Sequence, residues 1–302
     1  MKVFLSAIFA MLMILCLSNC SENLEQKGSP GYISEIQQWH QKREDRLKKE
    51  NGWLNLVGLY WLKQGENTFG SAKDNDIKFP PNAPAHVGTL TLNDSIVSIN
   101  VNPDVKVLND SLEVSSMILG NDMDENTTVL QTGTLIWYII KRGDKYGVRL
   151  KDLDAPLLKE FKSIDIFPIN EDWKLNARFV QYDQPQKVEI PTVIGTTEED
   201  VSPGYLSFTI DGKEYKLVAL KTGGGFFIIF ADQTSGEETY GAGRFIYTDE
   251  PDSNNNVILD FNKAYNPPCV FTRFATCPLP PKENYLKLKV TAGEKMWGEQ
   301  HH

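Results

Sequence analysis

Histidine is scarce in this sequence of 302 residues, and two of its four copies, His301 and His302, end the chain. The others are His40 and His86, so a Ser-His-Asp triad has few ways to assemble. The sequence also has no Gly-x-Ser-x-Gly elbow, no His-Glu-x-x-His pair and no Walker loop. These absences exclude the most recognisable hydrolase, zinc-protease and nucleotide-binding classes, and no catalytic residue is identified.

A basic run is missing as well. The formal net charge is −9, and an acidic chain without clustered lysine or arginine is a poor candidate for binding nucleic acid. The acidic loop 120–126 lacks the glycine and the terminal glutamate of an EF-hand. We therefore expect no nucleic-acid partner, no metal site and no cofactor.

Only one long apolar run is present, from residue 3 to residue 17, and it has the length of a secretory signal. It ends in Leu17-Ser18-Asn19-Cys20, which resembles the lipobox of bacterial lipoproteins. In that family the cysteine is diacylated and becomes the first residue of the mature chain. The alternative is an ordinary signal peptide or a short anchor in which Cys20 is incidental.

The lipoprotein interpretation implies a location in the cell envelope. Residues 1–19 would be the signal peptide and the polar residues 20–30 a tether. The protein would be held to a bacterial membrane through lipid on Cys20 and would face the periplasm or the exterior.

Two further cysteines, Cys269 and Cys277, form a candidate disulfide, because disulfides persist in exported proteins. Closing a loop of about nine residues would stabilise the fold by roughly 2.5 kcal/mol. Two buried thiols or a reactive pair are the alternatives, since the separation of the Cα atoms cannot be read from sequence.

Residues 30–50 predict a helix, with apolar residues near a 3.6-residue period. Ser34 and Gln37 can form a capping box at its start. His40 and Arg43 lie close to the apolar edge of this helix. We interpret them as the polar rim of a docked helix, with a ligand contact from Arg43 as the alternative.

The remainder predicts a mainly β fold, because short apolar segments alternate with turn residues. Residues 31–133 would hold the helix and a β-sandwich-like part. The order Gly70-Ser71 then Asn75-Asp76 resembles the start of a forkhead-associated sandwich. That family binds phosphothreonine through arginines that are missing at the corresponding places here, so no phosphopeptide site is expected.

A second antiparallel β sheet or barrel is expected over residues 134–297, followed by a tail at 298–302. Gly143-Asp144 and Asp211-Gly212 each separate two strand-like runs and predict β-hairpins. Residues 226–230 read as a fully buried strand.

The segment 257–295 is unlike the rest, since five prolines and several polar side chains are interleaved with phenylalanine. Proline excludes a regular helix or a central strand there, and the aromatic content argues against disorder. We expect an ordered loop with a functional role.

The motifs VRLKDLDAP, FADQTSGEETYGAGRF and LDFNKAYNPPCVFTRFATCPLPPKENYLKLKVTAGEK resemble the DUF1684 family, a domain of unknown function. The resemblance extends from about Trp39 to Lys295. It supplies candidate positions but no activity. The candidate ligand-binding residues are Arg149, Asp152, Asp232, Tyr240, Arg244, Asp260, Asn262, Asn266 and Glu294.

Three functional hypotheses follow. The first is a pocket in the C-terminal part that binds a small polar or anionic ligand, since the rigid fork of arginine suits a carboxylate or phosphate. The second is a hydrolase that uses carboxylates or a cysteine at the same place. The third is a structural envelope protein without a ligand. The structural alternative for Asp232, Arg244 and Asp260 is a buried ion-pair network that holds the proline-rich loop.

Overall fold

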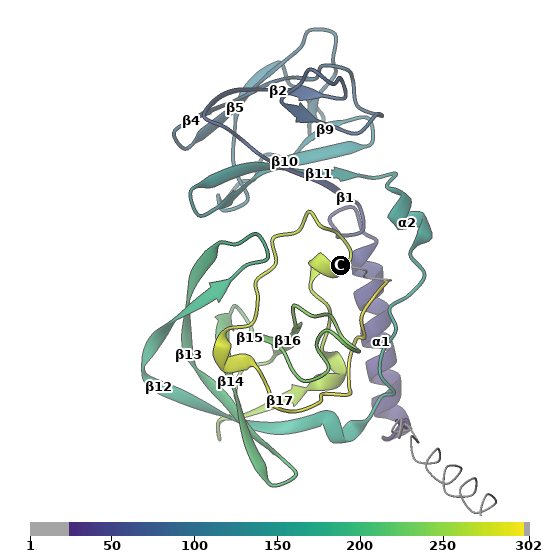
Figure 1. Ribbon diagram of the computed structural model, residues 1–302, viewed down its shortest axis with the longest axis vertical. Helices are drawn as coiled ribbons and strands as arrows, with labels where there is room; N and C mark the ends of the chain where they lie inside the picture. The colour runs from purple at the N-terminus through teal and green to yellow at the C-terminus, as the bar shows by residue number, and fades with distance from the viewer. Residues whose placement is uncertain (1–23, 299–302) are drawn as a thin grey trace, which may run out of the picture.

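The computed structural model describes residues 24–298. The expected signal peptide and Cys20 lie outside this range, as do the last four residues. The chain is 45% strand and 13% helix, so the expected mainly β class with one N-terminal helix is confirmed. Figure 1 shows two β bodies stacked along the long axis, with the helix beside the lower one.

The long helix, α1 (Pro30–Leu47), begins close to the predicted residue. Its N-cap is Ser29, whose side chain accepts a hydrogen bond from the N–H of Tyr32, rather than the predicted pair Ser34 and Gln37. The apolar face of α1 buries Tyr32 and Ile36 against Ile169 of the lower body. The helix therefore belongs to the lower body, although the strand that follows it in sequence enters the upper one.

The upper body contains two sheets. The strands of the first, in spatial order, are β1 (Leu56–Trp61), β11 (Lys145–Asp152), β10 (Leu135–Arg142), β9 (Leu130–Thr132), β6 (Leu108–Asn109) and β7 (Leu112–Glu113). Those of the second are β3 (Ile77–Lys78), β2 (Gly65–Gly70), β4 (Gly88–Asn93), β5 (Ile96–Val101) and β8 (Ser116–Leu119). We call residues 53–155 the N-terminal body.

One hydrophobic core joins these two sheets. Phe69 and Leu90 of the second sheet share it with Trp137 and Val148 of the first, and all four side chains are fully buried. Alternation of inward apolar and outward polar residues, visible in β4 and β5, produces such a core between two packed sheets. The sandwich-like character expected for this part is confirmed, while its likeness to a forkhead-associated domain stays a prediction.

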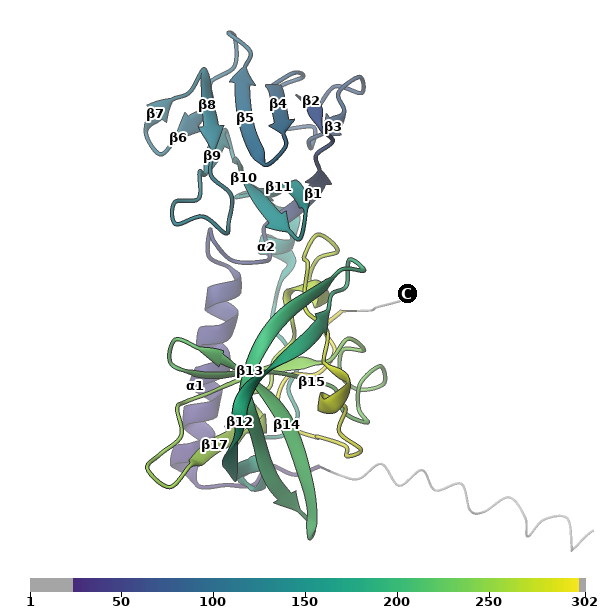
Figure 2. The same cartoon turned by 90° about the vertical axis from the view of Figure 1, so that its left-hand side faces the viewer.

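The lower body is built on one curled antiparallel sheet. Its strands, in spatial order, are β16 (Arg244–Thr248), β15 (Gly225–Phe230), β14 (Lys213–Thr222), β13 (Thr197–Ile210), β12 (Lys174–Pro191) and β17 (Asn256–Asp260). The far end of the β12–β13 hairpin rises toward the N-terminal body (Figure 2). With α1, residues 156–298 form the C-terminal body, joined to β11 through the short helix α2 (Pro156–Glu160).

The predicted boundary between residues 133 and 134 differs from the structure. It falls in the turn between β9 and β10, where Thr132 pairs with Leu135. Residues 135–152 thus complete the N-terminal sheet. Sequence patterns locate strands but not their partners, and β11 pairs with β1, almost ninety residues earlier.

The proline-rich segment is ordered, with three 3₁₀ turns: η2 (Phe261–Lys263), η3 (Pro268–Val270) and η4 (Lys282–Asn284). A fourth turn, η1 (Glu171–Trp173), precedes β12. The yellow trace in Figure 1 follows the segment across the face of the C-terminal sheet. Within residues 24–298, no helix is long and apolar enough to cross a membrane.

Candidate functional site

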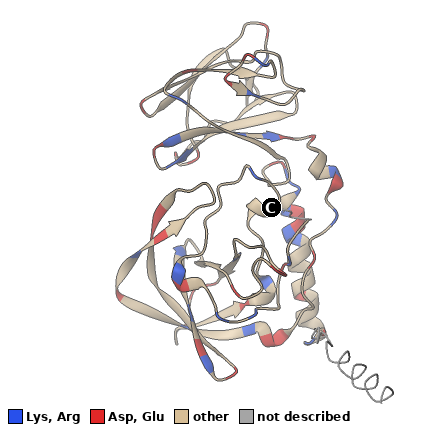
Figure 3. Cartoon of the chain, in the orientation of Figure 1, with Lys and Arg blue, Asp and Glu red and all other residues tan. Residues whose placement is uncertain are grey.

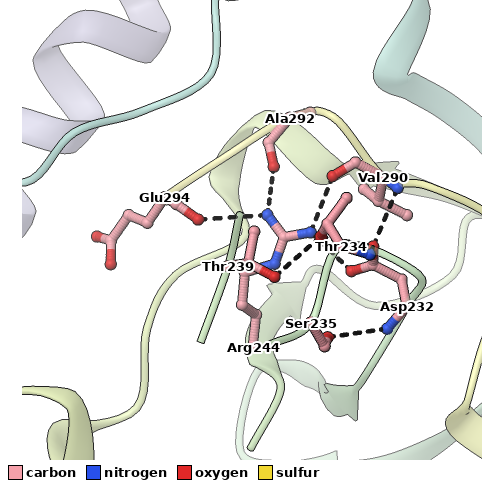
Figure 4. Close-up of polar contacts among 8 residues, drawn as sticks. All are labelled: Asp232, Thr234, Ser235, Thr239, Arg244, Val290, Ala292 and Glu294. Atoms are coloured by element: carbon pink, nitrogen blue, oxygen red, sulfur yellow. Dashed lines mark hydrogen bonds and ion pairs between the residues drawn. The ribbon is translucent and has the colours of Figure 1, made fainter. Parts of the chain in front are cut away.

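Arg244 is fully buried at the start of β16. Its Nη2 donates to Asp232 Oδ2 at 2.8 Å and to the carbonyl oxygen of Val290 at 3.0 Å (Figure 4). Its Nη1 donates to the carbonyl oxygens of Ala292 and Glu294. The guanidinium therefore fastens the C-terminal end of the chain to the sheet, and neither member of the ion pair reaches solvent.

Asp260 and Asn262 meet the first turn of α1. The hydroxyl of Tyr32 donates to Asp260 Oδ1 at 2.9 Å and accepts from Asn262 Nδ2 at 2.8 Å. The carbonyl oxygen of Asn262 accepts from His40 Nε2 at 2.9 Å. Burial, followed by the charge of Asp260, raises the pKa of Tyr32 far above its usual range. These bonds dock α1 onto η2.

Asn266 and Glu294 form a third sealed group. Glu294 Oε2 accepts from the backbone N–H of Asn266 at 2.7 Å, and Oε1 lies 3.5 Å from Arg43 Nε. Arg43 also donates to the carbonyl oxygen of Asn266 at 2.9 Å. Burial raises the pKa of Glu294 to about 7, although Arg43 and the Asn266 N–H oppose the rise.

The structure thus fits the buried ion pair of Arg244 with Asp232 better than a pocket around these residues, while Asp260 bonds to Tyr32 and Asn262 instead of joining that pair. A pocket that Arg244 and Asp260 line would require both side chains to face solvent, yet they are 0% and 5% exposed. Each of these side chains instead has at least one hydrogen-bond partner from a remote segment, although Arg244 Nε, Asp260 Oδ2 and Asn266 Oδ1 have none. Carboxylate catalysis by Asp232 or Asp260 therefore has no access to a substrate.

Two further candidates also have structural contacts. Asp152 accepts from Asn82 Nδ2 at 2.9 Å and from the N–H of Asp154 at 3.0 Å, which closes the turn after β11. Tyr240 packs beside Leu47 and Phe271, and burial raises its pKa to about 12.

Arg149 is different, because it lines a cleft between the two bodies. This inter-body cleft has a volume of about 800 Å³ and is bordered by Trp53, Arg142 and Arg149 on one side and by Phe245 and Thr276 on the other. Arg149 is 4% exposed and stacks over the Trp53 ring, 5.4 Å from its centroid. Its Nη2 donates to Thr276 Oγ1 at 3.1 Å, while its buried Nε has no hydrogen-bond partner. Among residues 24–298, no carboxylate forms an ion pair with it.

Positive charge continues along this face of the N-terminal sheet. Lys151, two residues further along β11, is 6% exposed and donates to the carbonyl oxygen of Gly52. Burial, and then the charge of Arg149, lowers the pKa of Lys151 to about 8. In Figure 3, blue positions mark the sheet edge that faces the C-terminal body.

Arg142 is the second arginine of the inter-body cleft. Its Nε donates to Thr276 Oγ1 at 3.2 Å, and its Nη1 pairs with Asp122 at 2.9 Å. One hydroxyl oxygen thus accepts from two guanidinium groups. Glu198 and Glu199 stand at the border of the cleft, where Glu199 is neutralised by Lys187 at 2.8 Å.

The two cysteines lie beside the same cleft, but the expected disulfide is not formed, and both are free thiols. The N–H of Cys269 donates to Cys277 Sγ at 3.1 Å. The hydrogen bond between the thiols lowers the pKa of Cys269, whereas burial raises that of Cys277 far above its usual range. Neither described histidine is available as a base, because His40 bonds to Asn262 and His86 lies beside Asn75.

Three residues of the inter-body cleft, Trp53, Arg142 and Thr276, were not among the sequence candidates. Arg142 closes the predicted hairpin at Gly143-Asp144, so its place at a strand end was a usable signal. Trp53 and Thr276 carried no local signal, because their role depends on the packing of the two bodies. Within the described part of the chain, no group of three or more His, Cys, Asp or Glu residues is arranged to hold a metal ion.

No curated protein matches this sequence. A solution NMR structure of an uncharacterized protein from Haloarcula marismortui is similar at 29% identity and a TM-score of 0.40. That match covers 48% of this chain and 80% of the other. The family resemblance, expected from about Trp39 onward, is shown over a shorter range that leaves out α1 and the N-terminal body. Residues 159–295 match the family described as "Protein of unknown function (DUF1684)".

Proposed function

We propose that the protein binds a small anionic ligand in the inter-body cleft, with Arg149 as its main contact. The observation that carries this proposal is a buried guanidinium with a free Nε–H and no carboxylate partner in the described chain. An unpaired buried charge is unfavourable, and an anion that reaches it supplies the missing interaction. A carboxylate or phosphate group suits the planar fork of arginine.

The rest of the cleft supports the same ligand class. Arg142 and Arg149 converge on Thr276 Oγ1, so an anionic oxygen near this hydroxyl would meet donors from both arginines. Trp53 fixes the Arg149 guanidinium by stacking, which limits the entropy lost when a ligand binds. Phe227 and Phe245 provide apolar wall on the opposite side.

The test is isothermal titration of the protein with phosphate, citrate and benzoate, with benzylamine as a cationic counterpart. We expect at least one anion to bind, and Arg149→Gln to weaken it by about 10- to 100-fold, since a charge-assisted bidentate contact is lost. Arg178→Gln is the matched control, because Arg178 is exposed on β12 outside the cleft. Absence of anion binding, or equal affinity in Arg149→Gln, would favour the ligand-free structural alternative.

We also propose that the protein is anchored to a bacterial membrane through lipid on Cys20, in the cell envelope. The support is the lipobox-like Leu17-Ser18-Asn19-Cys20 after an apolar run. Intact-mass spectrometry of the membrane fraction tests this proposal: a mature chain that starts at a diacylated Cys20 is expected. An unmodified Cys20 in the mature protein would refute it.

A further inference from the structure

A second cleft lies beside the C-terminal half of α1. It has a volume of about 600 Å³ and is separated from the inter-body cleft by Trp53, which borders both. We call it the helix cleft. Its walls combine aromatic rings with lysine and arginine, and none of its lining residues is Asp or Glu.

The aromatic wall is continuous. Tyr265 stacks with Tyr247 at 6.2 Å between ring centroids and 14° between planes, and Trp39 lies 6.2 Å from Tyr265 with its ring tilted. The Arg43 guanidinium lies over the Tyr265 ring, 4.7 Å from its centroid. Tyr247 is 57% exposed, although its ring also stacks with Phe227 at 4.8 Å between centroids, so the exposed part of the side chain borders the cleft. Trp39 and Tyr265 are partly buried beside it, so Tyr247 is the exposed member of this aromatic group.

The cations fall into two classes. Arg43 and Lys263 are neutralised by Glu294 and Glu35. Arg46 and Lys49 are exposed and form no ion pair within residues 24–298. Arg46 lies in the last turn of α1, where a positive charge is stabilised by the negative end of the helix dipole, which explains part of its presence. The dipole does not explain why Arg46 and Lys49 both border a cleft whose lining has no carboxylate.

We propose that the helix cleft binds a small anion that carries a flat ring, such as an aryl phosphate or an aromatic carboxylate. The ring would pack against the exposed part of Tyr247, and its anionic group would face Arg46 and Lys49. This site is separate from the proposed Arg149 site. Its ligand needs an aromatic ring, whereas a ligand of the inter-body cleft needs only the anionic group.

Phenyl phosphate is the probe, measured by isothermal titration in the Arg149→Gln protein, so that the inter-body cleft does not contribute. Inorganic phosphate lacks the ring and benzylamine lacks the negative charge, so both should bind at least about tenfold more weakly. The double variant Arg46→Gln/Lys49→Gln should weaken phenyl phosphate by about tenfold, and Tyr247→Ala by about threefold or more. Higher salt should weaken binding further, because these cations are exposed.

Two exposed residues outside the helix cleft serve as matched controls. Lys42 is exposed on α1 but does not line the helix cleft, and Tyr285 is 59% exposed on another part of the body. Lys42→Gln and Tyr285→Ala should bind phenyl phosphate like the parent protein. The proposal is overturned if no ring-bearing anion binds at millimolar concentration, if phosphate binds as tightly as phenyl phosphate, or if the cleft variants keep full affinity. Retained binding in Arg149→Gln separates this site from the one proposed between the bodies.

Discussion

At the scale of single residues, Asp232 and Glu294 show how burial acts on two carboxyl groups in the same core. Asp232 Oδ2 is paired with Arg244 at 2.8 Å, and its Oδ1 accepts from Thr234 and Val290. Glu294 has a longer ion pair with Arg43, and burial dominates its pKa. The first carboxylate serves as a fixed link, while the second is sensitive to pH.

Removing one member of the first pair should be strongly destabilising. We expect Arg244→Met to lower the free energy of unfolding by about 3–5 kcal/mol, because Asp232 would keep its buried charge without a cation. Urea denaturation measures the change. Lys221→Met breaks the exposed pair with Glu250 and should cost less than about 1 kcal/mol. Similar losses in the two variants would contradict the buried network.

Because of Glu294, we expect the free energy of unfolding to fall as the pH rises. Its pKa is raised from 4.5 to about 7 in the folded protein, so the folded state holds this proton more tightly than the unfolded chain. The resulting stability is present below pH 4.5 and is lost as the pH rises through 7. Glu294→Gln removes this loss. The free energy of unfolding of the variant, relative to that of the parent, should therefore rise by about 1–3 kcal/mol between pH 5 and pH 8.

His40 acts in the opposite direction and must be included in that comparison. Burial lowers its pKa to about 4, so its contribution is present above pH 6.5 and is lost as the pH falls through 4. Near pH 5 the pH dependence of stability that comes from Glu294 and the one that comes from His40 have opposite signs, so they partly cancel in the parent protein. The difference between parent and Glu294→Gln isolates the carboxyl group, and a difference that does not change with pH would refute the prediction.

At the scale of elements, the proline-rich segment forms hydrogen bonds with β14 and β15 at the point where these two strands separate. β14 and β15 pair as far as Leu220 and Phe227, and two positions further along the same register lie Val218 and Ile229. Asn284 of η4 enters there: it accepts from Val218 N at 2.7 Å and donates to the carbonyl oxygens of Val218 and Ile229. One amide side chain thus satisfies backbone groups that the parting strands leave unpaired.

Asn284→Leu should therefore be costly despite its similar volume. Three buried backbone groups would lose their hydrogen-bond partner. We expect the free energy of unfolding, measured by urea denaturation, to fall by at least about 2–4 kcal/mol. Asn176→Leu, at an exposed position of β12, should change stability by less than about 0.5 kcal/mol. Equal effects of the two substitutions would show that η4 is not a structural bridge.

At the scale of the whole molecule, the chain crosses between the bodies twice at one place. The N–H of Asp152 donates to the carbonyl oxygen of Asn55 at 2.8 Å, and Lys151 Nζ reaches that of Gly52. The N-terminal body is thus an insertion between α1 and the C-terminal segments on which α1 packs. Both proposed clefts lie near this junction, because Trp53 borders each of them.

This arrangement predicts unequal behaviour of fragments. Residues 53–155 hold their own core and should fold alone, whereas residues 156–298 should not, because they lack the face of α1 that buries Ile36 and Leu47. Residues 24–51 joined to 156–298 by a short Gly-Ser linker should fold again, since the two ends lie close together. Circular dichroism and thermal melting measure each fragment. A cooperative melt of residues 156–298 alone would contradict the assignment of α1.

Local features were predictable because they depend on neighbours in sequence. Asp211 and Gly212 have φ of 50° and 75°, as the predicted two-residue hairpin turn requires. The helix from Pro30 and the buried strand at residues 226–230 follow in the same way from periodicity. The N-cap at Ser29 was missed, since Ser34 offered an equally suitable local pattern.

The sequence by itself determined the strands, the hairpins, the helix and the polar character of the proline-rich segment. Only the tertiary structure decided which of its polar groups are sealed and which are open. Asp260 accepts a hydrogen bond from Tyr32, which is 228 residues away in the chain, while Arg149 meets a cleft that exists only where two bodies pack. Burial is a property of contacts between remote segments, so a motif reveals which residues are polar but not whether solvent or a ligand can reach them.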